Sequence, residues 1–159
     1  GVVGFVSGAV GVVGAGRAGA EVAVELDGLP DPRFRVNNGT PRPITVHQQL
    51  LDDHPDLVDR FLAVLLRAAD WAAGQPAEVD RILGAETGAG ADGVAGAYRP
   101  GTHLTLHPSL SAERLDLLAA QEAGLRAHGF LPEPVDVAAW ADPGPLRRAT
   151  EHARRTSAP

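Results

Sequence analysis

PDLVDRFLAVLLRAADWAA, residues 55–73, has the clearest helical pattern in the sequence. Pro55 stands at the first helical position, where its missing N–H costs nothing, and Gly74 ends the segment. Apolar side chains recur every three or four residues, which is the spacing of one helix face. The segment therefore predicts an amphipathic helix whose buried stripe consists of Leu57, Phe61, Leu65, Ala68 or Ala69, and Ala72.

Helices are also predicted on both sides of this segment, separated by glycine and proline. Ser111 and Asp136 have side chains of the kind that cap the start of a helix, and Gly129 suits a helix end. The predicted helices cover residues 48–52, 77–86, 91–98, 111–128, 136–140 and 146–153, with a loop over 99–110 and a frayed tail over 154–159.

The first part of the chain has a different pattern, which favours strands. Residues 1–20 are apolar and rich in glycine, which indicates a buried strand near 2–6 or 10–13, followed by a loose turn or a short helix. Residues 21–27, EVAVELD, alternate apolar and polar side chains as in a half-buried strand. Residues 33–46 indicate two extended pieces, in which Pro41 and Pro43 exclude a central strand. A strand-rich start followed by helices predicts part of a larger α/β protein.

Composition and charge exclude several classes of function. Fourteen basic and twenty acidic residues give a formal net charge of −6, which argues against nucleic-acid binding and attraction to anionic lipid. The chain has no cysteine, so it offers no disulfide, no thiolate metal site and no cysteine nucleophile. Glycines and Arg17 interrupt the apolar start, so no membrane span is expected. The absence of methionine indicates a processed chain or a fragment.

Three polar residues form the candidate binding site. Asn37, Asn38 and Thr40 gather amide and hydroxyl groups between two extended segments, where such groups can hold a polar ligand at the junction of two lobes. The same residues also suit a simple turn, because asparagine and glycine are common turn residues. We expect no catalytic residue in this chain.

Neither a cofactor nor a metal ion is expected. Residues 14–19, GAGRAG, match the dinucleotide-binding pattern G-x-G-x-x-G, but that site needs a helix after the glycines, and residues 21–27 indicate a strand. A dinucleotide-binding fragment stays a further alternative. His103 and His107 have the spacing of zinc ligands on a helix, but Pro100 and Pro108 place them in a loop.

Two segments resemble a known family. PDLVDRFL at 55–62, followed by AADWA at 68–72, is similar to the helix P-x-L-V-x-R-F-L … A-A-x-W-A of nitrate/sulfonate/taurine-type ABC-transporter solute-binding proteins. GFLP at 129–132, then Val135-Asp136 and AWADPGPL at 139–146, resemble the closing segment of the same family. The similarity extends from about Asn37 to Leu146.

This resemblance implies the C-terminal part of a two-lobe, periplasmic-binding-protein-like α/β fold. Residues 1–30 are then the end of the second lobe, and residues 31–46 are the crossover between the lobes. Residues 47–153 are the C-terminal helical part of the first lobe, and residues 154–159 are a disordered tail.

The implied function is that of the solute-binding component of an ABC importer for a small oxyanion, sulfonate-, taurine- or nitrate-like. Its partners are then the anionic ligand and an ABC permease, and its location is extracytoplasmic. Asn37, Asn38 and Thr40 are expected to line the ligand cleft, which closes as the two lobes rotate about a hinge.

An enzyme is the alternative. Residues 97–118 resemble the hydroxybiphenyl sulfinate desulfinase branch of the same family, which implies a cytoplasmic C–S hydrolase. The nucleophilic cysteine of that branch matches no position here, because the chain has no cysteine. A cysteine with histidine and arginine in the cleft of the remaining half would favour the enzyme, whereas an export signal would favour the importer.

Overall fold

The computed structural model describes residues 15–16, 18–23, 29–31, 33, 42–98 and 101–156. Helices make up 67% of these residues, and none of them belongs to a β-strand. The described part of the protein is therefore all-helical, and the α/β class with a strand-rich start that the sequence predicts is wrong for it.

Where the predicted strands overlap the described residues, no strand forms, for a physical reason, and the predicted strands at 2–6 and 10–13 lie outside the described residues. Glu21 and Val22 lie in coil and Ala23 in a bend, while residues 24–28 are outside the described part. Residues 42–46 also lack strand pairing. An alternating sequence becomes a strand only where a neighbour supplies backbone hydrogen bonds, and no segment within the described ranges does so.

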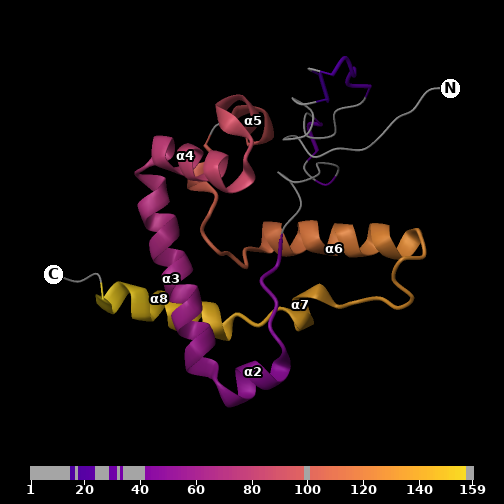
Figure 1. Cartoon of the computed structure of the whole chain (residues 1–159). Helices are drawn as coiled ribbons and strands as arrows, with labels where there is room; N and C mark the ends of the chain where they lie inside the picture. Colours follow the sequence, from indigo (N-terminus) through magenta and orange to yellow (C-terminus); the bar gives the residue numbers. More distant parts are fainter. Residues whose placement is uncertain are drawn as a thin grey trace.

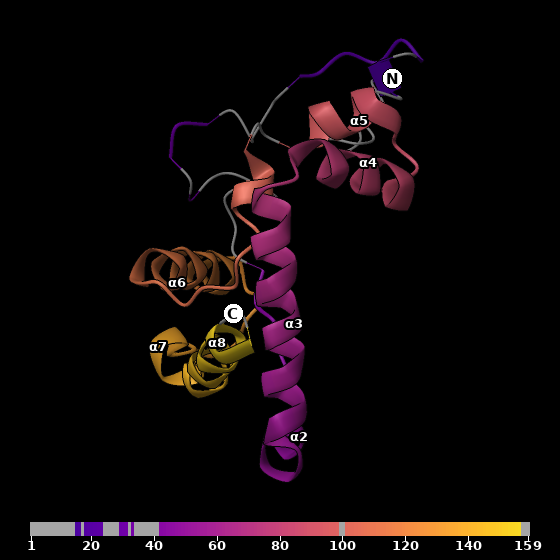
Figure 2. The same cartoon turned by 90° about the vertical axis from the view of Figure 1, so that its left-hand side faces the viewer.

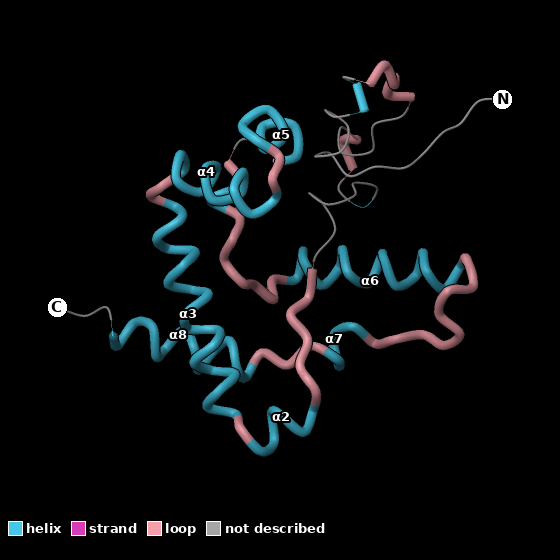
Figure 3. The backbone as a smooth tube through the Cα atoms, in the orientation of Figure 1, coloured by secondary structure: helices cyan, strands magenta, loops and turns pink. Residues whose placement is uncertain are grey.

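The described helices follow the predicted ones closely along the chain (Figures 1 and 3). Most bounds differ by one or two residues, but the last helix begins earlier and continues to Thr156, so residues 154–156 are helical where a frayed tail is predicted. The elements are α2 Gln48–Asp53, α3 Pro55–Ala73, α4 Pro76–Thr87, α5 Gly90–Ala97, η2 Thr102–Leu104, α6 Ala112–Ala127, α7 Val137–Trp140 and α8 Gly144–Thr156.

Local capping explains several of these bounds. The Ser111 hydroxyl accepts a hydrogen bond from the Arg114 N–H at 3.4 Å, and the Asp136 carboxylate accepts one from the Ala139 N–H at 3.0 Å. Gly129, with φ of 78°, follows the C-cap of α6 in the left-handed region that glycine adopts without strain. The predicted caps at Ser111 and Asp136 are confirmed.

The core lies where α8 crosses α3. Val58, Leu62 and Ala63 of α3 form a buried cluster with Ala149 of α8, which is completely buried. Figure 2 shows α6, α7 and α8 on one side of α3. The Arg148 guanidinium donates to the Asp59 carboxylate at 2.7 and 3.0 Å and so ties the two helices together.

The buried face of α3 differs from the predicted stripe. Leu57 and Phe61 are 48% and 50% exposed, whereas Val58 and Leu62, one position further along, are buried. Ala72 is buried as expected. The contact with α8 shifts the buried face of α3 by about one residue from the predicted one. Periodicity alone does not determine which face is buried, because the apolar residues of this helix cover more than one face.

The buried side chains are small. Among the described residues the buried set contains Ala, Val and Leu62, and no large side chain in it is fully enclosed. Val79 of α4 and Val94 and Ala97 of α5 form a second contact, at the end of α3 away from α2. Many larger apolar side chains therefore stay accessible on the helices. None of the described helices combines the length and apolarity needed to cross a bilayer.

Candidate functional site

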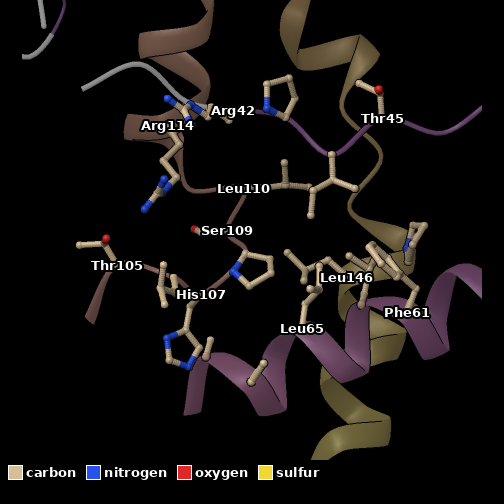
Figure 4. Close-up of a pocket in the computed structure, with 18 of the residues that line it drawn as sticks. Arg42, Thr45, Phe61, Leu65, Thr105, His107, Ser109, Leu110, Arg114 and Leu146 are labelled. Atoms are coloured by element: carbon tan, nitrogen blue, oxygen red, sulfur yellow. The ribbon is translucent and has the colours of Figure 1, made fainter. Parts of the chain in front are cut away.

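An open groove of about 1480 Å³ runs between α3, the first half of α6 and the corner where α7 meets α8. Residues 42–46, α2, α4, the end of α5 and the segment around η2 also line it. Figure 4 shows this groove with part of its lining. It collects side chains from segments that are far apart in the sequence.

Apolar side chains form most of the groove. α3 contributes the face next to its buried one, including Phe61, Leu65 and Ala68, and α8 contributes Leu146 (Figure 4). Trp71 and Trp140 also line the groove, and both are about half-exposed. The predicted stripe on α3 thus lies partly in an accessible groove and only partly in the core.

Polar groups gather on one side of the groove. Figure 4 shows Arg42, Arg114, Ser109 and Thr105 there, with His107 beside α3. The Arg114 guanidinium and the Ser109 hydroxyl are hydrogen-bond donors suited to the oxygens of an anion, whereas the Thr105 hydroxyl donates to the Thr102 carbonyl at 2.8 Å.

Arg114 is the most distinctive of these groups. It lies in the first turn of α6, where the Ser111 cap fixes the backbone, and its side chain is half-buried. Its guanidinium makes no hydrogen bond or ion pair with any residue that the structure describes, although buried polar groups are normally paired. Arg42 faces the same side of the groove from a different segment.

His107 is held by an acidic partner. Its Nε2 lies 2.8 Å from the Asp70 carboxylate of α3, which fixes the orientation of the imidazole ring. His103 lies in η2, as the predicted loop allows. Within the described ranges no group of three or more His, Asp or Glu side chains is placed to hold a metal ion.

Acidic groups are also present in the groove. Glu113 precedes Arg114 in α6 and is exposed, and Asp142 lies in the wall near α8. The Asp142 carboxylate accepts a hydrogen bond from the Gly144 N–H at 2.8 Å, so it is engaged in starting α8. The positive charge of the groove therefore comes from Arg42 and Arg114, and Glu113 beside Arg114 offsets part of it.

The sequence-predicted ligand residues Asn37, Asn38 and Thr40 lie outside the described residues. The predicted lobe boundary at residue 30 falls where few residues are described, whereas residues 42–46, before the boundary at 46, are described and line the groove. The structure therefore brings a different set of residues together at the candidate site.

The glycine motif has the wrong local geometry for a dinucleotide. Ala15 and Gly16 are helical, and the Ala20 N–H donates to the Ala15 carbonyl at 3.0 Å. Gly19 has φ of 86°, so this turn ends a helical segment. Bound pyrophosphate needs the start of a helix after the glycines, and the described residues of the motif do not provide one.

Sequence reasoning missed Arg42, Ser109 and Arg114. Arg42 stands between two prolines, and the spacing of the three residues matches no motif. Their proximity depends on how α6 and residues 42–46 are placed across α3, which is a tertiary property. The position of Arg114 one turn after the Ser111 cap is the one local signal, because donors at a helix start favour anions.

No protein-family model, curated protein or solved structure matches this chain.

Proposed function

We propose that this chain binds a small oxyanion, sulfonate-, taurine- or nitrate-like, as part of the solute-binding component of an ABC importer. The observation that supports the proposal is the half-buried, unpaired guanidinium of Arg114 on one side of an apolar groove. The sequences of α3 and α7–α8 resemble those of ABC-transporter solute-binding proteins, and this resemblance is the reason for proposing an importer.

The chemistry of the groove suits this class of ligand. A guanidinium offers five N–H donors in a planar fork, which match two oxygens of a sulfonate or carboxylate. Arg42 adds a second positive charge, and Ser109 adds a neutral donor. The whole chain has a net charge of −6, so these local groups, and not the overall field, must attract the anion.

Calorimetric titration of the chain with taurine, methanesulfonate and nitrate tests the proposal. We expect binding of at least one of them, and Arg114→Gln should weaken it roughly tenfold or more, because a hydrogen bond to a charged group contributes about 1.5–3 kcal/mol. Arg126→Gln is the matched control, since Arg126 lies on the same helix, pairs with Glu122 at 3.5 Å and does not line the groove.

Two results would contradict the proposal. The first is the absence of binding by all three anions, and the second is equal weakening by Arg114→Gln and Arg126→Gln. The desulfinase-like alternative gains no support from the groove, because the chain itself contains no cysteine to act as its nucleophile.

A further inference from the structure

We infer that the hydrogen bond between Asp70 and His107 determines where Arg114 lies over the groove, so that His107 is a positioning residue for the anion. The inference rests on the proposed function in one respect, which is the role given to Arg114. It assigns to a histidine just before α6 a task that no motif in the sequence indicates.

α6 has little packing that could hold it in place. None of the residues of α6 is buried, and the helix packs against α7, which is only four residues long. In Figure 1 most of α6 extends away from α3. Burying apolar surface is what fixes one helix on another, and α6 lacks a buried face. The position of Arg114, in the first turn of α6, therefore depends mostly on the segment that leads into this helix.

That segment is tied to α3 at His107. The Nε2 atom of His107 lies 2.8 Å from Oδ1 of Asp70 on α3, and η2, just before this segment, packs on the same helix (Figure 4). An ionised carboxylate only accepts hydrogen bonds, so Nε2 is the donor. The side chains of His107 and Asp70 are 40% and 70% exposed, so the bond adds little to the free energy of unfolding. Its loss should change the placement of the segment more than the stability of the protein.

A short series of local constraints connects this fixed point to Arg114. Pro108 follows His107 and restricts the backbone there. The Ser109 hydroxyl accepts a hydrogen bond from the Ser111 N–H at 3.2 Å. The Ser111 hydroxyl in turn accepts one from the Arg114 N–H at 3.4 Å, which fixes the first turn of α6. An anchor at His107 thus orients the turn that carries the guanidinium.

Pulsed electron spin resonance measures the placement directly. The chain has no cysteine, so nitroxide labels attach only at cysteines introduced for the purpose. A pair at two exposed positions, Arg60→Cys on α3 and Asp116→Cys on α6, reports the distance between these helices. His107→Phe, which keeps a ring and removes its nitrogens, should broaden that distance distribution. The pair Arg60→Cys and Glu151→Cys should stay unchanged, because the core fixes α8 on α3.

Two changes at Asp70 separate the hydrogen bond from the loss of a side chain. Asp70→Ala removes the acceptor and should broaden the distribution as His107→Phe does, whereas Asp70→Asn keeps an oxygen that accepts from Nε2 and should match the parent. The thermal unfolding midpoints of all three variants should stay close to that of the parent. His128→Phe is the control, since it removes a histidine hydrogen bond to the Gly124 carbonyl at the other end of α6.

Calorimetric titration with taurine, methanesulfonate and nitrate tests the consequence for the anion. His107→Phe and Asp70→Ala should weaken binding about two- to tenfold, because the guanidinium must then be ordered on binding. Asp70 does not line the groove, and removing its negative charge would by itself favour an anion, so weakening by Asp70→Ala points to position and not to charge. Adding either change to Arg114→Gln should bring no further loss.

The outcomes separate this inference from the proposed function. Label distances that stay unchanged in both His107→Phe and Asp70→Ala overturn the inference, whatever the anions do. Asp70→Ala that binds the anion as tightly as Asp70→Asn also overturns it. A parent chain that binds none of the three anions contradicts the proposed function, and the label distances alone then decide whether the bond places α6.

Discussion

Several ion pairs between described residues join neighbours on one helix. Arg60 pairs with Asp56 at 3.0 Å, and Arg81 donates through Nε to Glu78 at 2.8 Å. These pairs are exposed, so salt and water screen them and each supports its own helix only weakly. The pair between Asp59 and Arg148 differs, because it connects α3 to α8 and lies beside the core.

Glu78→Gln gives a prediction for the pH dependence of stability. Hydrogen bonding from Arg81 lowers the pKa of the Glu78 carboxyl below its ordinary value of 4.5. A lowered pKa in the folded state stabilises the fold above the unfolded pKa, and this contribution is lost as the pH falls through the folded pKa. In urea unfolding, Glu78→Gln should therefore be slightly less stable than the parent chain at neutral pH and equal to it well below pH 4.5.

The control for that experiment is Glu86→Gln on the same helix. Glu86 forms no ion pair with a described residue, so its loss should leave stability at neutral pH nearly unchanged. A difference between parent and Glu78→Gln that persists unchanged into acid would show that the ion pair is not its cause.

At the level of the elements, the sequence predicts what is local. Proline at the first position of α3, the caps Ser111 and Asp136, and the glycines after α4 and α6 all act within a few residues. These signals placed the helices correctly.

The errors concern contacts between distant segments. The alternation of residues 21–27 resembles a strand, but a strand needs a partner that a one-dimensional pattern does not contain. The buried face of α3 depends on the contact of Val58 and Leu62 with Ala149, and the anion side of the groove depends on Arg42 meeting α6. Neither can be deduced from spacing along the chain.

Gly84→Ala should stabilise α4. Gly84 lies inside this helix, and a Cβ there meets Val94 Cγ2 at 3.5 Å, an ordinary contact distance. Alanine is better than glycine in a helix by up to about 1 kcal/mol, so the free energy of unfolding should rise by a comparable amount. Thermal or urea unfolding measures it.

Gly93→Ala is the matched comparison on α5. There the added Cβ lies 2.7 Å from the Ala89 Cβ, so the backbone must shift to accept it. This variant should gain less than Gly84→Ala or lose stability. A larger gain at Gly93 than at Gly84 would contradict the close approach of Gly93 to Ala89.

Ala149→Leu should strongly weaken the contact between α3 and α8. Ala149 is completely buried against Val58 and Leu62, and inserting a larger side chain into a packed site costs about 1–3 kcal/mol. Ala119→Leu is the control: it makes the same substitution on the exposed side of α6, where the larger side chain extends into solvent and carries no packing cost. Equal stability of the two variants in urea unfolding would mean that α8 does not pack on α3.

Across the whole molecule, the described helices bury small side chains and leave large ones accessible. Phe61, Trp71 and Trp140 are about half-exposed, and all three border the groove. Accessible apolar surface of this kind in a folded protein marks a place where another molecule binds.

The folded chain should therefore bind anilinonaphthalenesulfonate, whose fluorescence increases in apolar surroundings. Near-ultraviolet circular dichroism of the tryptophans confirms that the protein is folded during the titration. Decanesulfonate should displace the dye, because both have an apolar body and a sulfonate head. A folded chain that gives no fluorescence increase would show that the groove is closed in solution.

The tie between Asp59 and Arg148 joins positions 89 residues apart. During synthesis α3 is made long before α8. The buried face of α3 therefore lacks its partner until the residues between the two helices have been made. Closing so long a loop costs entropy before any contact repays it, and folding dominated by such distant contacts is slow. The contact between α3 and α8 can therefore form only once α8 has been synthesised.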